Sequence, residues 1–186
     1  MAELTAVDKL AAQAEYYAAT FALGHLPGPP ALATTVVACM DARLNVYGLL
    51  GLSEGDAHVL RNAGGSATDD VLRSLAISQR KLGTREVIVI QHTGCGMVTF
   101  DGEAFRDAIV SETGVEPCWP SAGAFPDVEQ NVRDSVARIR GDLAIPHRDR
   151  VRGFVYDVFS GRLDEVGPTV APTAVAASAA SAHPLR

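Results

Sequence analysis

The sequence lacks features that would point to a membrane, a secretory route or a nucleic acid. Its longest apolar runs, such as the one at 87–90, are far shorter than the roughly 20 residues that cross a bilayer. Its first residues include Glu3 and Asp8, and they lack the basic region, apolar block and cleavage site of a secretory signal. Lysine and arginine do not cluster, and the net charge is −6. We therefore expect a cytoplasmic protein that binds neither membrane nor nucleic acid.

Cysteine is scarce, and its placement argues against a disulfide framework. The chain has three cysteines, an odd number, and both Cys39 and Cys95 lie near an aspartate or a histidine. That neighbourhood favours metal binding or catalysis over disulfide pairing. We expect Cys118, which precedes Trp119, to be a buried core thiol.

The length and composition predict one folded domain with two distinct ends. The 186 residues are 47% apolar, which is enough for a single core. Residues 4–22 carry an apolar stripe at helical spacing, and the HLPGPP segment that follows cannot continue a helix, so 1–30 is read as a helical arm with a stiff connector. The arm could pack on its own domain or on a partner subunit. We assign 31–166 to an α/β domain and 167–186, rich in Ala, Ser, Pro, Thr and Val, to a disordered tail.

The central part of the chain alternates short β-branched runs with helical patterns. Strands are predicted at 33–40, 57–61, 87–91 and 153–159, and helices at 68–83 and 127–140. Thr68 is a candidate N-cap of the first of these helices, and Gly83 is a candidate C-terminal stop. This alternation predicts an α/β fold with a mainly parallel sheet flanked by helices. The Ser160-Gly161 turn predicts a hairpin after the fourth strand.

Two short stretches, CMDAR at 39–43 and HTGC at 92–95, each begin at the end of a predicted strand. Parallel strands bring their carboxyl ends to one edge of the sheet, so these stretches face each other if strands one and three are neighbours. Two thiolates and an imidazole select zinc, and three protein ligands with an open fourth position are typical of a catalytic site. The fourth ligand is Asp41 or water. Arg43 could clamp Asp41 by a bidentate pair and hold it off the ion.

The two stretches, together with RNAGG at 61–65 between them, resemble the signature of the β-class carbonic anhydrases. The resemblance covers roughly residues 32–160. It implies a four-stranded parallel core of order 2-1-3-4, and a homodimer or dimer of dimers in which the N-terminal helix reaches across the partner. It also implies site roles for particular residues: Zn2+ is held by Cys39, His92 and Cys95, with Asp41 as a fourth ligand in closed forms, and Asp41 and Arg43 form a catalytic dyad.

The function that this resemblance implies is reversible hydration of carbon dioxide to bicarbonate and a proton by a zinc-bound hydroxide. Two alternatives remain open from the residues. The same site could hydrolyse carbonyl sulfide or carbon disulfide, or Asp41 could close the coordination in a zinc-stabilised binding or sensor protein. Away from the site, we expect His58 to be a hydrogen-bonded core histidine and 63–65 to be a turn that lines the pocket.

Overall fold

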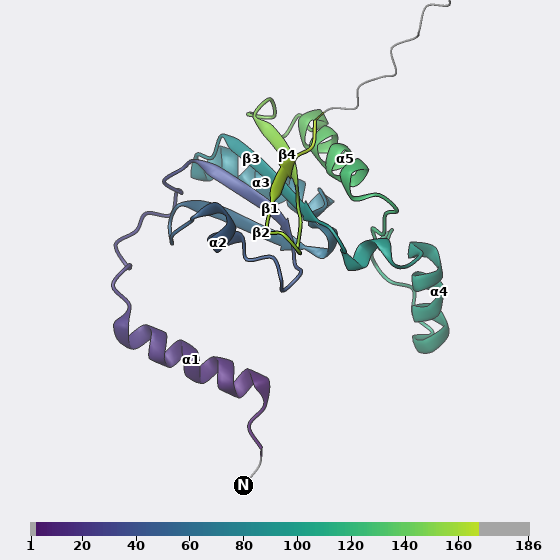
Figure 1. The fold of residues 1–186 in the computed structure, drawn as a ribbon, viewed down its shortest axis with the longest axis horizontal. Coiled ribbons are helices and arrows are strands. Elements are labelled where there is room, and N and C mark those ends of the chain that lie inside the picture. Colours follow the sequence, from purple (N-terminus) through teal and green to yellow (C-terminus); the bar gives the residue numbers. More distant parts are fainter. Residues whose placement is uncertain (1–2, 168–186) are drawn as a thin grey trace, which may run out of the picture.

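A computed structural model of the chain describes residues 3–167, so the tail predicted to be disordered lies, apart from Gly167, outside the described residues. Within this range a single five-stranded sheet has the order β2-β1-β3-β4-β5 (Figure 1). The strands are β1 Thr34–Cys39, β2 Ala57–Asn62, β3 Glu86–His92, β4 Val151–Tyr156 and β5 Leu163–Glu165. The first four are parallel, and β5 returns antiparallel to β4 as the predicted hairpin. The predicted α/β fold and its 2-1-3-4 core are therefore confirmed.

The helices include three that the sequence pattern predicts and two that it does not. The helices are α1 Ala6–Thr20, α2 Val46–Leu50, α3 Asp69–Leu82, α4 Gly102–Thr113 and α5 Val128–Gly141, with 3-10 turns at Ala63–Gly65 and Gly96–Val98. The pattern misses α2 because it has five residues, too few to show a helical period. It misses α4 because Phe105, Ile109 and Val110 are the only large apolar residues of that helix, so its apolar stripe is weak.

Two element ends differ from the sequence prediction for local reasons. Strand β4 ends at Tyr156 rather than at 159, because the Asp157 carboxylate accepts hydrogen bonds from the amides of Phe159 and Ser160 and turns the chain. Thr68 occupies the N-cap of α3 but its side chain makes no capping hydrogen bond, so the predicted side-chain cap is wrong. Gly83 ends α3 in the left-handed conformation, as predicted.

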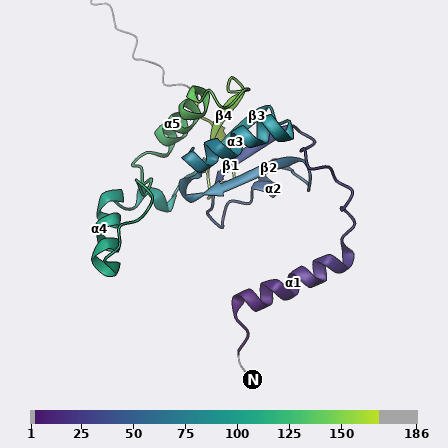
Figure 2. The ribbon, with the colours of Figure 1, turned by 180° about the vertical axis from the view of Figure 1, so that it is seen from behind.

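The two faces of the sheet are covered unequally. On one face α3 and α5 bury Val37, Leu75, Val89 and Ile139, each fully or almost fully inaccessible (Figure 2). On the other face the short α2 covers only part of the surface, and a hollow of about 620 Å³ remains over β1, β3 and β4. Alternate residues of each strand point to opposite faces, so both cores are drawn from the same strands.

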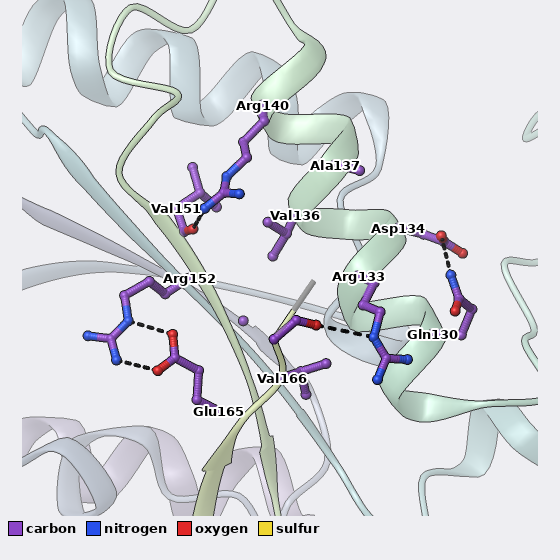
Figure 3. A pocket seen from close by; sticks show the side chains of 12 residues that line it. Gln130, Arg133, Asp134, Val136, Ala137, Arg140, Val151, Arg152, Glu165 and Val166 are labelled. Carbon is purple, nitrogen blue, oxygen red and sulfur yellow. Dashed lines mark hydrogen bonds and ion pairs between the residues drawn. The ribbon is translucent and has the colours of Figure 1, made fainter. Parts of the chain in front are cut away.

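The junction between α5 and the β4–β5 hairpin encloses a second hollow, of about 380 Å³ (Figure 3). Arg152 pairs with Glu165 through two hydrogen bonds of 2.8 and 2.6 Å across the hairpin. Arg140 donates from α5 to the Val151 carbonyl at 2.7 Å. The Arg140 bond therefore joins the helix to the hairpin, and the Arg152 pair joins the two strands of the hairpin.

Helix α1 stands apart from the sheet and is joined to it by the extended connector (Figure 1). None of its residues is buried by the part of the chain that the structure describes. Val7, Leu10 and Tyr16 are each about 70% exposed. The helix begins with a capping box in which Thr5 and Asp8 bond each other's backbone amides. None of the helices in residues 3–167 has the length and apolar character needed to cross a bilayer.

Candidate metal centre

The carboxyl ends of β1 and β3 bring the two predicted stretches together. The strands are parallel neighbours, and Cys39 and His92 are their last residues. The Sγ atoms of Cys39 and Cys95 lie 3.9 Å apart, and a ligand atom of His92 joins them in a group within 4.8 Å. All three side chains are buried. The inference from strand order is thus confirmed: the two stretches meet in space.

The His92 ring is oriented so that one of its nitrogens faces the two sulfurs. Its Nδ1 lies 3.0 Å from the Thr93 carbonyl, which can only accept, so Nδ1 carries the proton and Nε2 presents a lone pair. That Nε2 is buried and has no hydrogen-bond partner among the described residues. A buried polar atom without a partner is costly. Its position beside two sulfurs fits a cation that would accept all three lone pairs.

The two thiols differ in their electrostatic surroundings. Burial raises the pKa of the Cys39 thiol, but the His92 side chain and the backbone amides of Asp41 and Gly64 outweigh it and lower that pKa to about 7. Burial and the nearby Cys39 raise the pKa of Cys95. The protein alone therefore favours one thiolate and resists a second. A divalent cation between the sulfurs would remove that resistance by stabilising the second thiolate. Two sulfurs and an imidazole are a donor set that suits a metal of zinc's softness.

The glycine turn at 63–65 forms one wall beside Cys39. Gly65 has a φ of +64° and packs so closely that a Cβ there would lie 2.7 Å from the Cys39 backbone nitrogen. It would also lie 2.9 Å from the Ile90 carbonyl oxygen. Only glycine fits both the backbone conformation and the space. The turn therefore lines the site, as the sequence predicts for this segment.

Asp41 and Arg43 form a bidentate pair at the rim of the cluster. Arg43 donates from Nε to Oδ1 at 2.9 Å and from Nη2 to Oδ2 at 2.7 Å, and Nη2 also reaches the Gly94 carbonyl at 3.0 Å. These hydrogen bonds hold the pKa of the Asp41 carboxyl well below its usual range. Its Oδ2 lies 3.6 Å from Nε2 of His92. The carboxylate is thus ionised, next to the cluster and engaged by Arg43.

Arg61 is a site residue whose role the sequence pattern does not reveal. It donates from Nε to the Cys39 carbonyl at 2.9 Å and from Nη2 to the Asp41 carbonyl at 2.7 Å. Both bonds hold the chain where it leaves β1. The signal in the sequence is the RNAGG segment, which begins at this arginine, but spacing alone does not show which carbonyls it reaches.

The structure places two other predicted residues away from the cluster. Cys118 is exposed, so the expectation of a buried core thiol is wrong. It lies after α4, in a segment that extends from the body rather than into a core. His58 is part-buried, and its Nδ1 lies 2.8 Å from the Ser78 hydroxyl oxygen, as expected of a hydrogen-bonded core histidine.

Fold and site together define a class: an α/β protein with a Cys–His–Cys group suited to a metal ion and an Asp–Arg pair at the carboxyl edge of a parallel sheet. Comparison with known proteins narrows this class. Residues 34–114 match the family model described as carbonic anhydrase. Beta-carbonic anhydrase 1 of Mycobacterium tuberculosis is 51% identical over 165 residues, which is 89% of this chain and 100% of that protein. The chain belongs to the β-carbonic anhydrases, whose enzyme class is carbonate dehydratase, a lyase.

Two further similarities agree with this assignment. The crystal structure of the carbonic anhydrase from Streptococcus mutans superimposes with a TM-score of 0.80 at 39% identity, covering 90% of this chain and 100% of that one. A carbon disulfide hydrolase of Acidithiobacillus thiooxidans is 34% identical over 147 residues, which is 69% of this chain and 74% of that protein. The hydrolase is thus the more distant of the relatives named here.

Proposed function

We propose that the chain catalyses the reversible hydration of carbon dioxide to bicarbonate and a proton, with zinc as its cofactor. The observation that carries this proposal is the buried Cys39–His92–Cys95 group beside an ionised carboxylate engaged by an arginine. A site that only stabilises the fold has no need of that pair. The 51% identity to a β-carbonic anhydrase supports the same function.

Zinc would be held by the sulfurs of Cys39 and Cys95 and by Nε2 of His92. When bound there, it would supply Lewis acidity that lowers the pKa of a coordinated water to about 7. The Thr93 carbonyl fixes the histidine tautomer that this requires. Arg43 engages both carboxylate oxygens of Asp41, which would keep that carboxylate from ligating the metal in place of water.

The surrounding residues would orient the reactants. Asp41 has lone pairs left after its bonds to Arg43, so it can accept a hydrogen bond from a reacting water and orient it. Leu44, Met97 and Phe125 belong to the same buried cluster as the two cysteines. They provide an apolar wall suited to a small apolar gas, and they lower the local dielectric so that the charge of Asp41 acts more strongly.

Stopped-flow measurement of carbon dioxide hydration, with zinc quantified in the same sample, tests this proposal. We expect one zinc per chain and rapid hydration between pH 6.5 and 9. Inactivity of the zinc-replete protein across that range would refute the proposal. Carbonyl sulfide and carbon disulfide should be assayed in parallel, because the ratio of catalytic efficiencies decides between these gases. The greater distance of the carbon disulfide hydrolase favours carbon dioxide.

We also propose that the protein acts in the cytoplasm as a homodimer or a dimer of dimers. Two features support a second copy as the partner. Helix α1 presents exposed apolar residues such as Leu10, and an isolated helix of its length is marginally stable in water. The sheet face over Val36, Ile88 and Phe154 is hollowed and incompletely covered. Light scattering during gel filtration should give a dimeric or larger mass, and Leu10→Glu should reduce it, whereas Gln13→Glu on the same helix should not.

A further inference from the structure

A row of polar side chains on α5 faces the glycine turn. Asn131, Ser135 and Arg138 are spaced by four and three residues, so they share one side of the helix. The Ser135 hydroxyl accepts a hydrogen bond from the Ala67 amide at 3.2 Å, and Arg138 donates to the Ala67 carbonyl at 2.7 Å. The helix is therefore attached to the segment that follows the turn by side chains, beside the apolar stripe that packs on the sheet.

Asn131 connects this row to the turn and to β3. Its Nδ2 donates to the Ser66 hydroxyl at 2.8 Å and to Oε1 of Gln91 at 3.0 Å. Gln91 is fully buried, and its Nε2 donates in turn to the Gly65 carbonyl at 3.4 Å. Both hydrogens of the Asn131 amide are used, and both ends of the Gln91 amide are used. The chain of bonds is thus directional, from the helix to the turn.

The opposite side of the same turn touches the metal centre. The Gly64 backbone helps to lower the pKa of the Cys39 thiol. Gly65 contacts the backbone at Cys39 and Ile90 with no room for a Cβ. Any shift of the turn would therefore move the Cys39 backbone and change the surroundings of its sulfur. Hydrogen bonds to a ligating thiolate reduce the electron density that it donates to a metal.

We propose that Asn131 is a positioning residue of the metal centre, which acts through Gln91 and Ser66 to hold the glycine turn at 63–65 against Cys39. This inference rests on the zinc site of the proposed function and extends it from residues that touch the metal to a helix that does not. A buried amide such as Gln91 is costly unless both its ends are bonded. An apolar residue in place of Gln91 would fill the same space without that cost. The presence of the amide therefore indicates that its hydrogen bonds have a role of their own.

Cobalt substitution gives a readout that reports on the sulfur directly. The Co2+-loaded full-length protein shows sulfur-to-metal charge-transfer absorption, whose energy follows the electron density on the thiolates. We compare wild type with Asn131→Ala, which removes both bonds, and with Asn131→Asp, which turns a donor toward Gln91 into an acceptor. Gln130→Ala is the matched control, because its amide bonds only Asp134 within α5, at 2.9 Å (Figure 3).

We expect both Asn131 variants to shift the charge-transfer band to longer wavelength and to bind zinc about tenfold more weakly in a chelator competition. The Gln130 variant should match wild type in both. A wild-type band and affinity in both Asn131 variants would overturn the inference, and so would a lowered Tm with an unchanged band, which is the result for a purely structural residue. Failure of wild type itself to bind zinc or to hydrate carbon dioxide would instead refute the proposed function.

Discussion

The cluster of Cys39, His92 and Cys95 and the pair of Asp41 and Arg43 lie side by side but are built in different ways. The His92 side chain is fully buried, whereas those of Asp41 and Arg43 are 18% and 52% exposed. The cluster is positioned by the ends of β1 and β3 and by the glycine turn at 63–65, where Gly65 packs against Cys39 with no room for a Cβ. The pair is positioned by three hydrogen bonds between Arg43 and Asp41 at the rim of the site.

The buried cluster is suited to holding a metal, whereas the pair at the rim is suited to controlling what else reaches that metal. Buried ligands on packed strands have little freedom, so their geometry is set when the protein folds. An exposed ion pair is weakly stabilised and can rearrange within the folded protein. We therefore expect changes in the cluster to remove the metal, and changes in the pair to alter reactivity while the metal stays.

The largest effect should come from removing a ligand of the cluster. Cys95→Ser should lose zinc and activity together, because a neutral hydroxyl replaces a thiolate that a borderline-soft ion prefers. Zinc quantification and carbon dioxide hydration on the same sample measure both. Cys118→Ser is the control, because that thiol is exposed and lies outside the cluster. Retention of full zinc by the Cys95 variant would contradict the ligand assignment.

Breaking the pair should separate binding from reactivity. Arg43→Ala should keep zinc and lose activity by about 100-fold or more, because Asp41 is no longer engaged and oriented. Arg43→Lys should also be impaired, since one ammonium cannot reproduce the bidentate contact. Arg73→Ala, which removes an exposed pair with Asp70 within α3, should change neither property. An active Arg43→Ala protein would show that the pair is dispensable.

A substitution in the glycine turn at 63–65, which forms one wall of the cluster, should mainly lower the stability of the protein. Gly65→Ala should destabilise the protein by roughly 3 kcal/mol or more, because the added Cβ overlaps the backbone at Cys39 and the residue has a positive φ. Urea unfolding measures the change. Gly114→Ala is the matched control, with a φ of +71° but nothing within 4 Å of its Cβ, and it should cost only about 1 kcal/mol. Equal losses in the two variants would mean that packing against Cys39 is unimportant.

The smallest effect should be that of pH on the pair. Because Arg43 lowers the pKa of Asp41, the carboxylate should stay ionised from pH 5 to 9, and any change in activity in that range has another origin. The stability that this ionisation contributes is present above the unfolded pKa of about 3.9 and is lost as pH falls through the lower folded value. Carboxyl carbon NMR of Asp41 should show no inflection between pH 5 and 9. An inflection there would mean that Arg43 does not hold the carboxylate.

The parts of the fold that the sequence predicts well are those with a strong local signal. The β-branched runs around Val37 and Val89 and the apolar stripe of α3 each bury a face, and their positions agree with the structure within about two residues. The sequence pattern misses helix α4 and misreads the exposed Cys118. Neither packs into the core of the described chain, so no burial pattern marks them correctly. The sequence predicts the candidate site because its residue types are unusual together. Gln91 and Asn131 carry ordinary amides, so nothing in the sequence marks them.

The sequence by itself determines which chemical groups are present: two thiols, an imidazole and an Asp–Arg pair, each placed at the end of a strand or in the loop that follows it. It also determines the right-handed, parallel connection that sends those strand ends to one edge. Only the tertiary structure decides which nitrogen of His92 is free and that α5 reaches the turn behind Cys39. The first depends on how one buried ring is oriented, and the second depends on contacts between segments up to about seventy residues apart, whose distances are set by packing rather than by local pattern.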